Sequence, residues 1–209
     1  MLLALAVLPL LGPWFTHPAL DTAGAAERTG LTSAQVHALS DRSVEELLLG
    51  PGTFDFPGPD GQPFYDPSER AHLRDARLLL GISLLAGGLA ILVLALTLVR
   101  RTDSRSATWR VISRTGLATA VGVVLLGFLS IFAFDSLFIL FHRVFFPGGN
   151  WSFDPATQHL VQLYPFRFWE LAATALGSLL LVLGLATWLL GRVLTARTPA
   201  VPAFDATSG

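Results

Sequence analysis

The sequence predicts an all-α membrane protein with four transmembrane helices and a small extracytoplasmic α+β cap between helices 1 and 2. Three observations predict this fold class. Hydrophobic residues make up 52% of the 209 residues and charged residues only 14%, whereas soluble domains carry about 25% charged residues. Several long apolar runs are separated by polar segments. Arginines are concentrated in one short connector between two of these runs. Lipid is therefore the expected solvent for much of the chain.

The first apolar segment, residues 1–16, is short for a bilayer core, which needs about 20 helical residues. It contains Pro9 and Pro13, and Trp14 marks an interface near its end. A secretory signal is the alternative interpretation, but a positively charged start and a convincing A-x-A cleavage site are missing. We therefore expect transmembrane helix 1 in this segment.

Residues 17–76 are the one sizeable polar segment and predict the cap. Thr32 or Ser33 is suited to capping a short helix, and Ser43 with Glu46 forms a second capping-box pattern before another helix. The pentad Pro-Gly-Pro-Asp-Gly that follows, flanked by apolar residues, indicates a loose β-hairpin. About 60 residues bury too little surface for a large core of their own. We therefore expect the cap to lean on the helix ends or on the membrane surface.

The remaining boundaries follow the apolar runs and the charges between them. The expected segments are transmembrane helices 77–99, 111–141 and 167–191, a cytoplasmic loop 100–110, an extracytoplasmic loop 142–166 and a cytoplasmic tail 192–209. The third apolar run exceeds the bilayer thickness, so that helix must tilt or project beyond the headgroups.

The distribution of arginine predicts the orientation. Residues 100–114 carry five arginines against one acid, whereas residues 16–77 carry five arginines against ten acids. The positive-inside rule places the basic connector in the cytoplasm. Four helices with both ends inside then place the cap and the loop 142–166 outside, in a multi-pass membrane protein.

All five histidines fall on the extracytoplasmic side of this topology. His17, His37 and His159 are interpreted as interfacial or surface residues. His72 and His142 differ, because each lies at the outer end of an expected transmembrane helix. These two histidines either share a function or are independent interfacial caps.

Two aspartates lie close to these histidines in the sequence. Asp75 follows His72 by three residues, so a helix places both on one face, where a carboxylate can orient the imidazole. Asp135 lies inside the third span, about two turns from His142. It either orients a polar cleft or bonds to nearby arginine or backbone groups.

The absence of familiar motifs limits the chemistry. The chain has no cysteine, which excludes thiolate zinc sites and a cysteine nucleophile of its own. No G-x-S-x-G, P-loop, H-E-x-x-H or G-x-G-x-x-G pattern occurs. A metal site from His72, His142 and Asp75 lacks zinc-type spacing, so no metal or cofactor is expected. A net charge of -1 gives no argument for nucleic acid as a partner.

Two segments resemble a known family. F-H-x-x-F-F from Phe141 to Phe146 is followed by N-W-x-F-D-P from Asn150 to Pro155, and E-R-x-H-L-x-D ends at Asp75. This pattern is similar to that of a four-span bacterial family of integral membrane proteins that includes the lipoprotein intramolecular transacylase. The F-H-x-x-F-F and N-W-x-F-D-P portion is the specific part.

The resemblance implies an acyltransferase whose partners are diacylated lipoproteins and membrane lipid. An acyl chain moves from the glycerol sn-2 position to the α-amine of the N-terminal cysteine and gives a lyso-form lipoprotein. The family's two motif histidines match His72 and His142, which are therefore the expected catalytic residues.

Roles for the site residues follow as hypotheses. One histidine acts as the general base and the other as an acid or oxyanion donor, with Asp75 orienting His72. Additional donors to the oxyanion are expected among Arg70, Arg143 and Asn150. The residues expected to hold the acyl chains at the interface are Phe145, Phe146 and Trp151.

Two other functions compete with catalysis. A non-catalytic membrane scaffold, or a module that binds a lipid or partner, requires no shared cleft between the histidines. A transporter is a weaker alternative, because four helices with one buried acid make a thin pathway.

Overall fold

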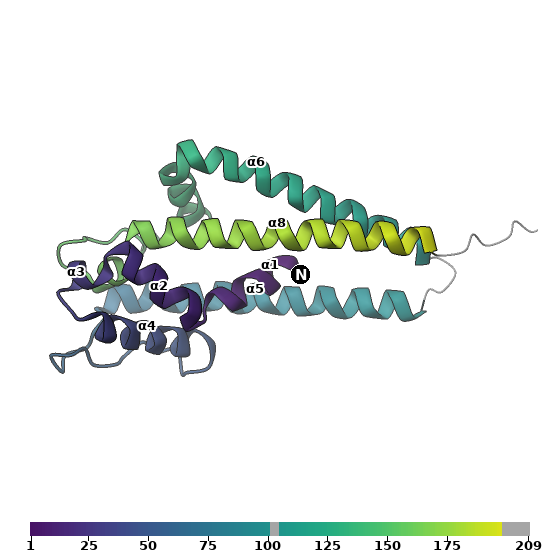
Figure 1. Cartoon of the computed structure of the whole chain (residues 1–209). Coiled ribbons are helices and arrows are strands. Elements are labelled where there is room, and N and C mark those ends of the chain that lie inside the picture. The colour runs from purple at the N-terminus through teal and green to yellow at the C-terminus, as the bar shows by residue number, and fades with distance from the viewer. Residues whose placement is uncertain (101–104, 198–209) are drawn as a thin grey trace, which may run out of the picture.

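The computed structural model describes residues 1–100 and 105–197, and the regular elements in these residues are helices (Figure 1). They are α1 (Leu2–Leu10), α2 (Pro13–Ala23), α3 (Ala25–Thr29), α4 (Ser33–Leu48), α5 (Pro67–Arg100), α6 (Arg105–Phe145), α7 (His159–Leu163) and α8 (Phe166–Arg197). The expected loop 100–110 and tail 192–209 lie partly outside the described residues.

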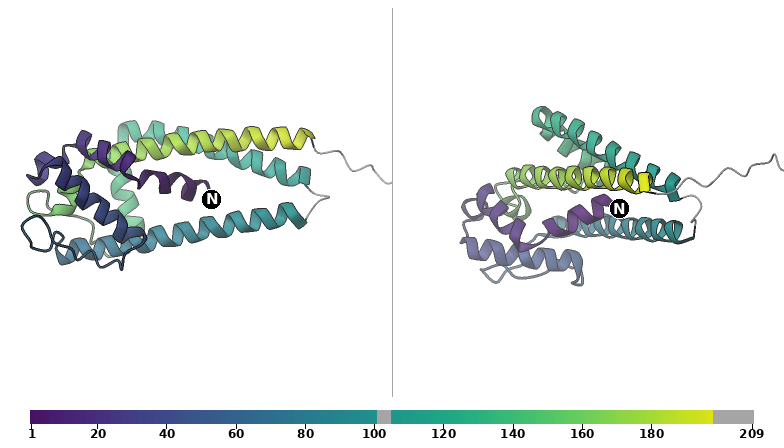
Figure 2. Two further views of the ribbon diagram at one scale, coloured as in Figure 1. Left: turned by 60° about the horizontal axis from the view of Figure 1, so that its bottom comes forward. Right: turned by 45° about the vertical axis from the view of Figure 1, so that its right-hand side comes forward.

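Within the described residues, α5, α6 and α8 are long and apolar enough to cross a membrane. α1 and α2 pass the same test only as a pair, and this pair is bent by 66°. Pro9 and Pro13 flank the bend, and neither can donate a backbone N–H to a continuous helix. α1 lies between α5 and α8 (Figure 2). The first apolar segment is therefore two short helices with a sharp break.

α6 and α8 are in direct backbone contact at glycines. A Cβ atom added to Gly116 would lie 2.5 Å from the backbone nitrogen of Trp188 and 2.7 Å from the carbonyl oxygen of Gly184. One added to Gly191 would lie 2.7 Å from the backbone nitrogen of Ser113. The Ser113 hydroxyl donates to the carbonyl of Trp188 (3.0 Å). Small residues allow this close approach in membrane helices.

α6 breaks at Ala133, whose φ of -141° and ψ of 29° are not helical. Beyond the break α6 turns back toward the start of α8 (Figure 1). There the ring of Phe134 lies 5.3 Å from that of Phe166, and Phe138 lies 6.3 Å from Trp169. The break therefore directs the last turns of α6 to the end of the bundle where α5 begins.

The cap contains one long helix, α4. Its N-cap Thr32 forms a capping box with Gln35, which confirms the predicted start. The predicted second start at Ser43 is wrong, because α4 continues through it. The Ser43 hydroxyl donates to the carbonyl of Leu39 (2.8 Å) and lies 2.8 Å from the Tyr65 hydroxyl. Since a carbonyl only accepts, Tyr65 is the donor to Ser43.

The predicted β-hairpin is a turn closed by one antiparallel bridge, between Pro57 and Pro63. The backbone N–H of Gly58 donates to the carbonyl of Gln62 (2.7 Å). Prolines supply no N–H with which to extend a ladder. No strand forms in the described residues, so the cap lacks the β part that the sequence predicts.

The core of the cap continues into the ends of the long helices. Its buried side chains include Leu20, Val36, Leu39, Phe54 and Tyr65 from the cap, together with Leu73 of α5, Leu160 and Leu163 of α7, and Phe168 of α8. This arrangement confirms that the cap leans on the helix ends.

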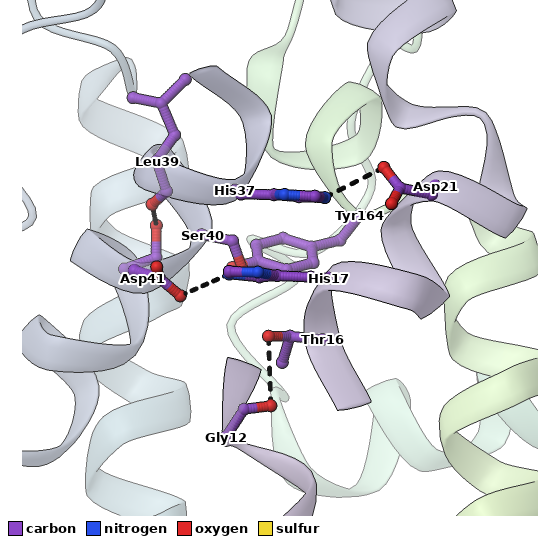
Figure 3. Close-up of polar contacts among 10 residues, drawn as sticks. Gly12, Thr16, His17, Asp21, His37, Leu39, Ser40, Asp41 and Tyr164 are labelled. Atoms are coloured by element: carbon purple, nitrogen blue, oxygen red, sulfur yellow. Dashed lines mark hydrogen bonds and ion pairs between the residues drawn. The ribbon is translucent and has the colours of Figure 1, made fainter. Parts of the chain in front are cut away.

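Two reciprocal histidine–aspartate pairs join α2 to α4 (Figure 3). His17 Nε2 donates to Asp41 and His37 Nε2 donates to Asp21, each at 2.9 Å. The two imidazoles stack with ring centroids 4.1 Å apart. Histidine and aspartate are four residues apart in each helix and therefore share a face. His17, which the sequence predicts as an interfacial residue, and His37, which it predicts as a surface residue, thus form a contact between two helices.

A polar clamp holds the loop after α6 against the start of α5. Asp66 caps α5 by accepting the N–H of Ser68 (2.7 Å) and of Glu69 (2.9 Å), and its other oxygen accepts from Gln158 Nε2 (2.8 Å). Glu69 is only 1% exposed and accepts the N–H of Asp66 (2.7 Å) and of Leu160 (2.6 Å). The clamp thus joins α5, the loop and α7.

The clamp predicts a pH dependence of stability. Although partial burial favours the neutral acid, hydrogen bonds from Ser68 and Gln158 hold the pKa of Asp66 at about 2. An unfolded aspartate titrates near about 3.9, so ionised Asp66 stabilises the fold fully above about pH 4 and loses this effect as the pH falls through about 2. We expect Asp66→Asn to lower the unfolding temperature at about pH 6, by an amount that shrinks toward about pH 2. Glu27→Gln, which removes an exposed carboxylate, is the control, and a deficit that does not change with pH would contradict this role.

The glycine contact predicts a stability difference between two matched variants of α6. Gly116→Ala places a Cβ against the backbone of α8, and overpacking of this kind typically costs about 1–3 kcal/mol. Gly122→Ala is the control, because nothing lies within 4 Å of a Cβ at that position. We expect a lower unfolding temperature in detergent for Gly116→Ala only. Equal temperatures for the two variants would show that the helices do not approach this closely.

Candidate active site

His72 and His142 lie together although 70 positions separate them in the sequence. His72 is in the second turn of α5, and His142 is in the last turn of α6. Their ring centroids are 5.9 Å apart, and the ring planes differ by 24°. His142 is buried, with 9% of its surface exposed. The two long helices thus present both imidazoles at the end of the bundle that carries the cap.

Aromatic rings surround the two imidazoles. Phe146 contacts both, with ring centroids 4.5 Å from His72 and 5.5 Å from His142. Phe153 lies 5.5 Å from His72, and Trp151 lies 5.2 Å from His142. Each imidazole is therefore packed on apolar faces that restrict the approach of water.

The hydrogen bonds distinguish the two histidines. His142 Nδ1 lies 2.8 Å from the carbonyl oxygen of Phe138. Because a carbonyl only accepts, Nδ1 carries the proton, and Nε2 of the neutral ring keeps its lone pair. In contrast, His72 Nδ1 is buried without a hydrogen-bond partner among the described residues. A buried polar atom without a partner is uncommon, and its position beside a second imidazole indicates a place for a substrate atom.

Asp75 and Asn150 form a second polar contact at the site. Asn150 Nδ2 donates to Asp75 Oδ2 at 2.7 Å, which ties the loop after α6 to α5. Asn150 is therefore the hydrogen-bond partner that the structure gives to Asp75. The other end of the amide, Asn150 Oδ1, is buried and has no partner in the described part of the chain. It is an acceptor available to a ligand.

The other residues proposed from the sequence are more dispersed. Arg70 forms an ion pair with Asp55 (2.6 Å) in the cap. Arg143 is exposed, and Phe145 is 49% exposed. Asp135 is exposed on α6, and no described residue forms an ion pair or hydrogen bond with its carboxylate. Arg70 thus forms its ion pair with the cap and not with the histidine pair.

A pocket of about 340 Å³ adjoins the site between α5 and the end of α6. It is lined by Asp75, Leu78, Leu79, Ile82, Phe145, Phe146, Pro147 and Gly148. Ligand pockets commonly have volumes of about 300–1,000 Å³ with mainly apolar walls and a few polar groups. The pocket shares Phe146 with the histidine pair and Asp75 with Asn150, so a ligand held there lies next to both.

Sequence reasoning missed two contributors, Phe138 and Phe153. Phe138 is four residues before His142 on one helix, so its ring packs on the imidazole with centroids 4.2 Å apart. Its backbone carbonyl also accepts from His142 Nδ1, and a backbone bond of this kind cannot be recognised from residue type. Phe153 is the aromatic residue of the N-W-x-F-D-P segment. Within the described residues, no group of three or more histidine, aspartate or glutamate side chains is placed to hold a metal ion.

A family model and a solved structure both match this chain. Residues 12–169 match the model of the family described as lipoprotein intramolecular transacylase. The fold is similar to the in meso structure of the membrane integral lipoprotein intramolecular transacylase Lit from Bacillus cereus, with a TM-score of 0.73 and 18% identity over 94% of this chain and 89% of that one. No curated protein matches the sequence. The structural likeness shows the fold, and the family match covers most of the sequence. The chain therefore belongs to the lipoprotein intramolecular transacylase family of bacterial membrane enzymes.

Proposed function

We propose that this protein moves an acyl chain within a diacylated lipoprotein, from the glycerol sn-2 oxygen to the α-amine of the N-terminal cysteine. The product is a lyso-form lipoprotein. The observation that carries the proposal is the close pair of imidazoles, 5.9 Å apart, beside an apolar pocket in a chain of this family. The substrate brings its own nucleophile, so the enzyme must supply a base, stabilise the oxyanion and hold the amine near the ester.

In the proposed topology the chain crosses the membrane four times, with the bent α1–α2 pair counted as the first crossing. The arginine-rich connector between α5 and α6 then faces the cytoplasm. The cap, the loop 142–166 and the histidine pair face the extracytoplasmic side of the bacterial cell membrane. This is the side on which mature lipoproteins display their lipid-modified cysteine.

His142 is proposed as the general base. Its Nδ1–H bond to Phe138 leaves Nε2 free to accept a proton. The neutral amine attacks the ester carbonyl carbon, and a C–N bond forms. His142 Nε2 takes a proton from the nitrogen of the tetrahedral adduct and passes it to the sn-2 oxygen as the C–O bond breaks. The histidine is thereby returned to its neutral state. An amine that enters as an ammonium ion first releases one proton to solvent.

His72 and Asn150 are proposed to position the reacting groups. A ring N–H of His72 donates to the carbonyl oxygen as it becomes an oxyanion, a contribution that strengthens in the transition state. Asn150 Oδ1 accepts a hydrogen bond from the amine. The bond from Asn150 Nδ2 to Asp75 holds the amide in the required orientation. These roles supply partners for both buried polar atoms that otherwise have none.

The pocket beside the histidines is proposed to hold an acyl chain. The side chains of Leu78, Leu79 and Ile82 on α5 face Phe145 and Phe146 across it. A chain bound there places its ester end near Phe146, which contacts both imidazoles.

The histidine roles predict the loss of acyl transfer in two variants. A reporter lipoprotein is coexpressed with this protein in a host that lacks N-acylation, and its N-terminal peptide is measured by mass spectrometry. We expect an acyl group on the cysteine amine with the wild type, and a decrease of about 10²–10⁴-fold in the rate with His72→Gln or His142→Gln. Glu27→Gln, at an exposed position of the cap, is the control and should keep activity.

The same experiment separates the enzyme from the alternative function. An unchanged diacylglyceryl peptide in the presence of well-expressed wild type would favour a non-catalytic scaffold or a lipid-binding module. Full activity of both histidine variants would reject the two-histidine site while leaving the reaction intact.

The pocket predicts an effect of side-chain size on α5. Ile82→Trp fills space in the pocket and should slow transfer of long acyl chains more than of short ones. Leu92→Trp is the matched control, because it is also exposed on α5 but lies about 15 Å further along the helix. The measurement is the acyl transfer rate with reporter substrates of different chain length. An equal loss in both variants would mean that bulk on α5 acts through folding rather than through the pocket.

A further inference from the structure

A second pocket, of about 280 Å³, lies between the start of α6 and the end of α8. It is lined by Arg110, Ser113, Arg114, Arg192, Thr195 and Ala196. This is the end of the bundle opposite the cap and the histidine pair (Figure 1). The pocket therefore has no part in the proposed acyl transfer.

Three guanidinium groups share this pocket without an acidic lining residue. The carboxylates on α6 and α8 are those of Asp135 and Glu170, each more than 20 residues along its helix, or roughly 30 Å away. None of the three arginines forms an ion pair within the described residues. The acids Asp103 and Asp205 lie outside those residues. Three like charges around one pocket repel one another, so an anion bound between them is stabilised.

The hydroxyl groups of the pocket are already engaged as donors. Ser113 donates to the carbonyl of Trp188 (3.0 Å), and Thr195 donates to the carbonyl of Gly191 (2.7 Å). The N–H groups of the arginines are thus the donors left for a ligand, and their planar fork matches phosphate oxygens. Arg192 also lies over the Trp188 ring, with its Cζ 5.3 Å from the ring centroid. This contact holds the guanidinium at the depth where tryptophan favours the membrane interface.

An apolar track runs from the arginines toward the middle of the bundle. It consists of Leu117 and Val121 on α6, and Leu185 and Leu189 on α8, which are 43–57% exposed. On α6 these positions follow Arg114 by three and seven residues, and on α8 they precede Arg192 by the same spacings. They therefore share the arginine faces of their helices. Hydrocarbon chains can pack on this apolar track, whereas a free phosphate ion makes no favourable contact with it.

We propose that the arginine pocket binds the headgroup phosphate of an anionic phospholipid whose acyl chains lie along the apolar track. The volume of about 280 Å³ fits a headgroup and not a whole lipid. The site is independent of the catalytic proposal, because it shares no residue with the histidine pair or its pocket.

The first test uses the full-length wild-type protein in a neutral detergent. Phosphatidylglycerol, phosphatidylcholine and inorganic phosphate are added separately, and the unfolding temperature and the lipid retained in native mass spectrometry are measured. We expect stabilisation and retention with phosphatidylglycerol only. Stabilisation by inorganic phosphate to the same extent would assign the site to a free anion, and no preference for phosphatidylglycerol over phosphatidylcholine would overturn the proposal.

The second test locates the site. Arg114→Gln and Arg192→Gln should each weaken retention of phosphatidylglycerol by roughly fivefold, the effect expected for one basic residue at an anionic lipid. Arg28→Gln, which removes an exposed arginine from α3 in the cap, is the charge-matched control. Equal loss with Arg28→Gln would show a general charge effect and reject the pocket. The result with wild type alone decides the lipid preference if a variant fails to fold.

Discussion

The polar clamp between the start of α5 and the loop after α6 is the constraint on which the arrangement of the two histidines depends. α6 packs chiefly on α8, so contact along the length of α5 and α6 does not fix His72 against His142. Glu69 lies one turn before His72, and its buried carboxylate accepts the N–H of Leu160. Breaking this bond leaves one oxygen of a buried carboxylate without a donor, which is costly, because the N–H of Asp66 bonds to the other oxygen. The loop held in this way also carries Phe153 onto His72. The packing of the loop on α5 and the position of Phe153 beside His72 therefore depend on the same contacts.

The candidate active site combines tight packing with incomplete hydrogen bonding. Phe146 touches both imidazoles, and Trp151 and Phe138 restrict His142. The two buried polar atoms without partners in the described residues, one on His72 and one on Asn150, both lie here. Each such atom typically costs about 1–3 kcal/mol. Stability alone gives no reason to gather two of them in one place, whereas the amine and the ester of the proposed substrate would supply a partner for each.

The sequence reveals the parts of this protein that depend on composition and on local spacing. The three long membrane helices, the Thr32 cap and the candidate histidines follow from apolar runs, a capping box and motifs. The continuation of α4 through Ser43 was not predicted. The Ser43 hydroxyl donates to the carbonyl of Leu39 within the helix instead of capping a new one. Its contact with Tyr65, which lies in another segment, favours this arrangement. The break at Ala133 could not be predicted, because no proline or glycine occupies that position.

The hydrogen-bond partner of Asp75 was also not predicted, because Asn150 lies 75 residues away in the sequence. Long-range partners of this kind are set by tertiary packing, which a single sequence does not contain.

The glycines of α8 constrain how this chain can vary in length. Gly177, Gly184 and Gly191 recur every seven residues, and a Cβ on Gly177 would meet Val123 of α6, just as the other two face α6. A seven-residue period keeps one stripe on a partner only if the two helices wind around each other with a left-handed twist. Insertion of a single residue between these glycines would rotate the stripe by about 100° and separate the backbones, whereas insertion of seven would restore it. In α6 and α8, the number of residues between successive glycines is therefore constrained more strictly than the identity of the side chains on the lipid-facing surface.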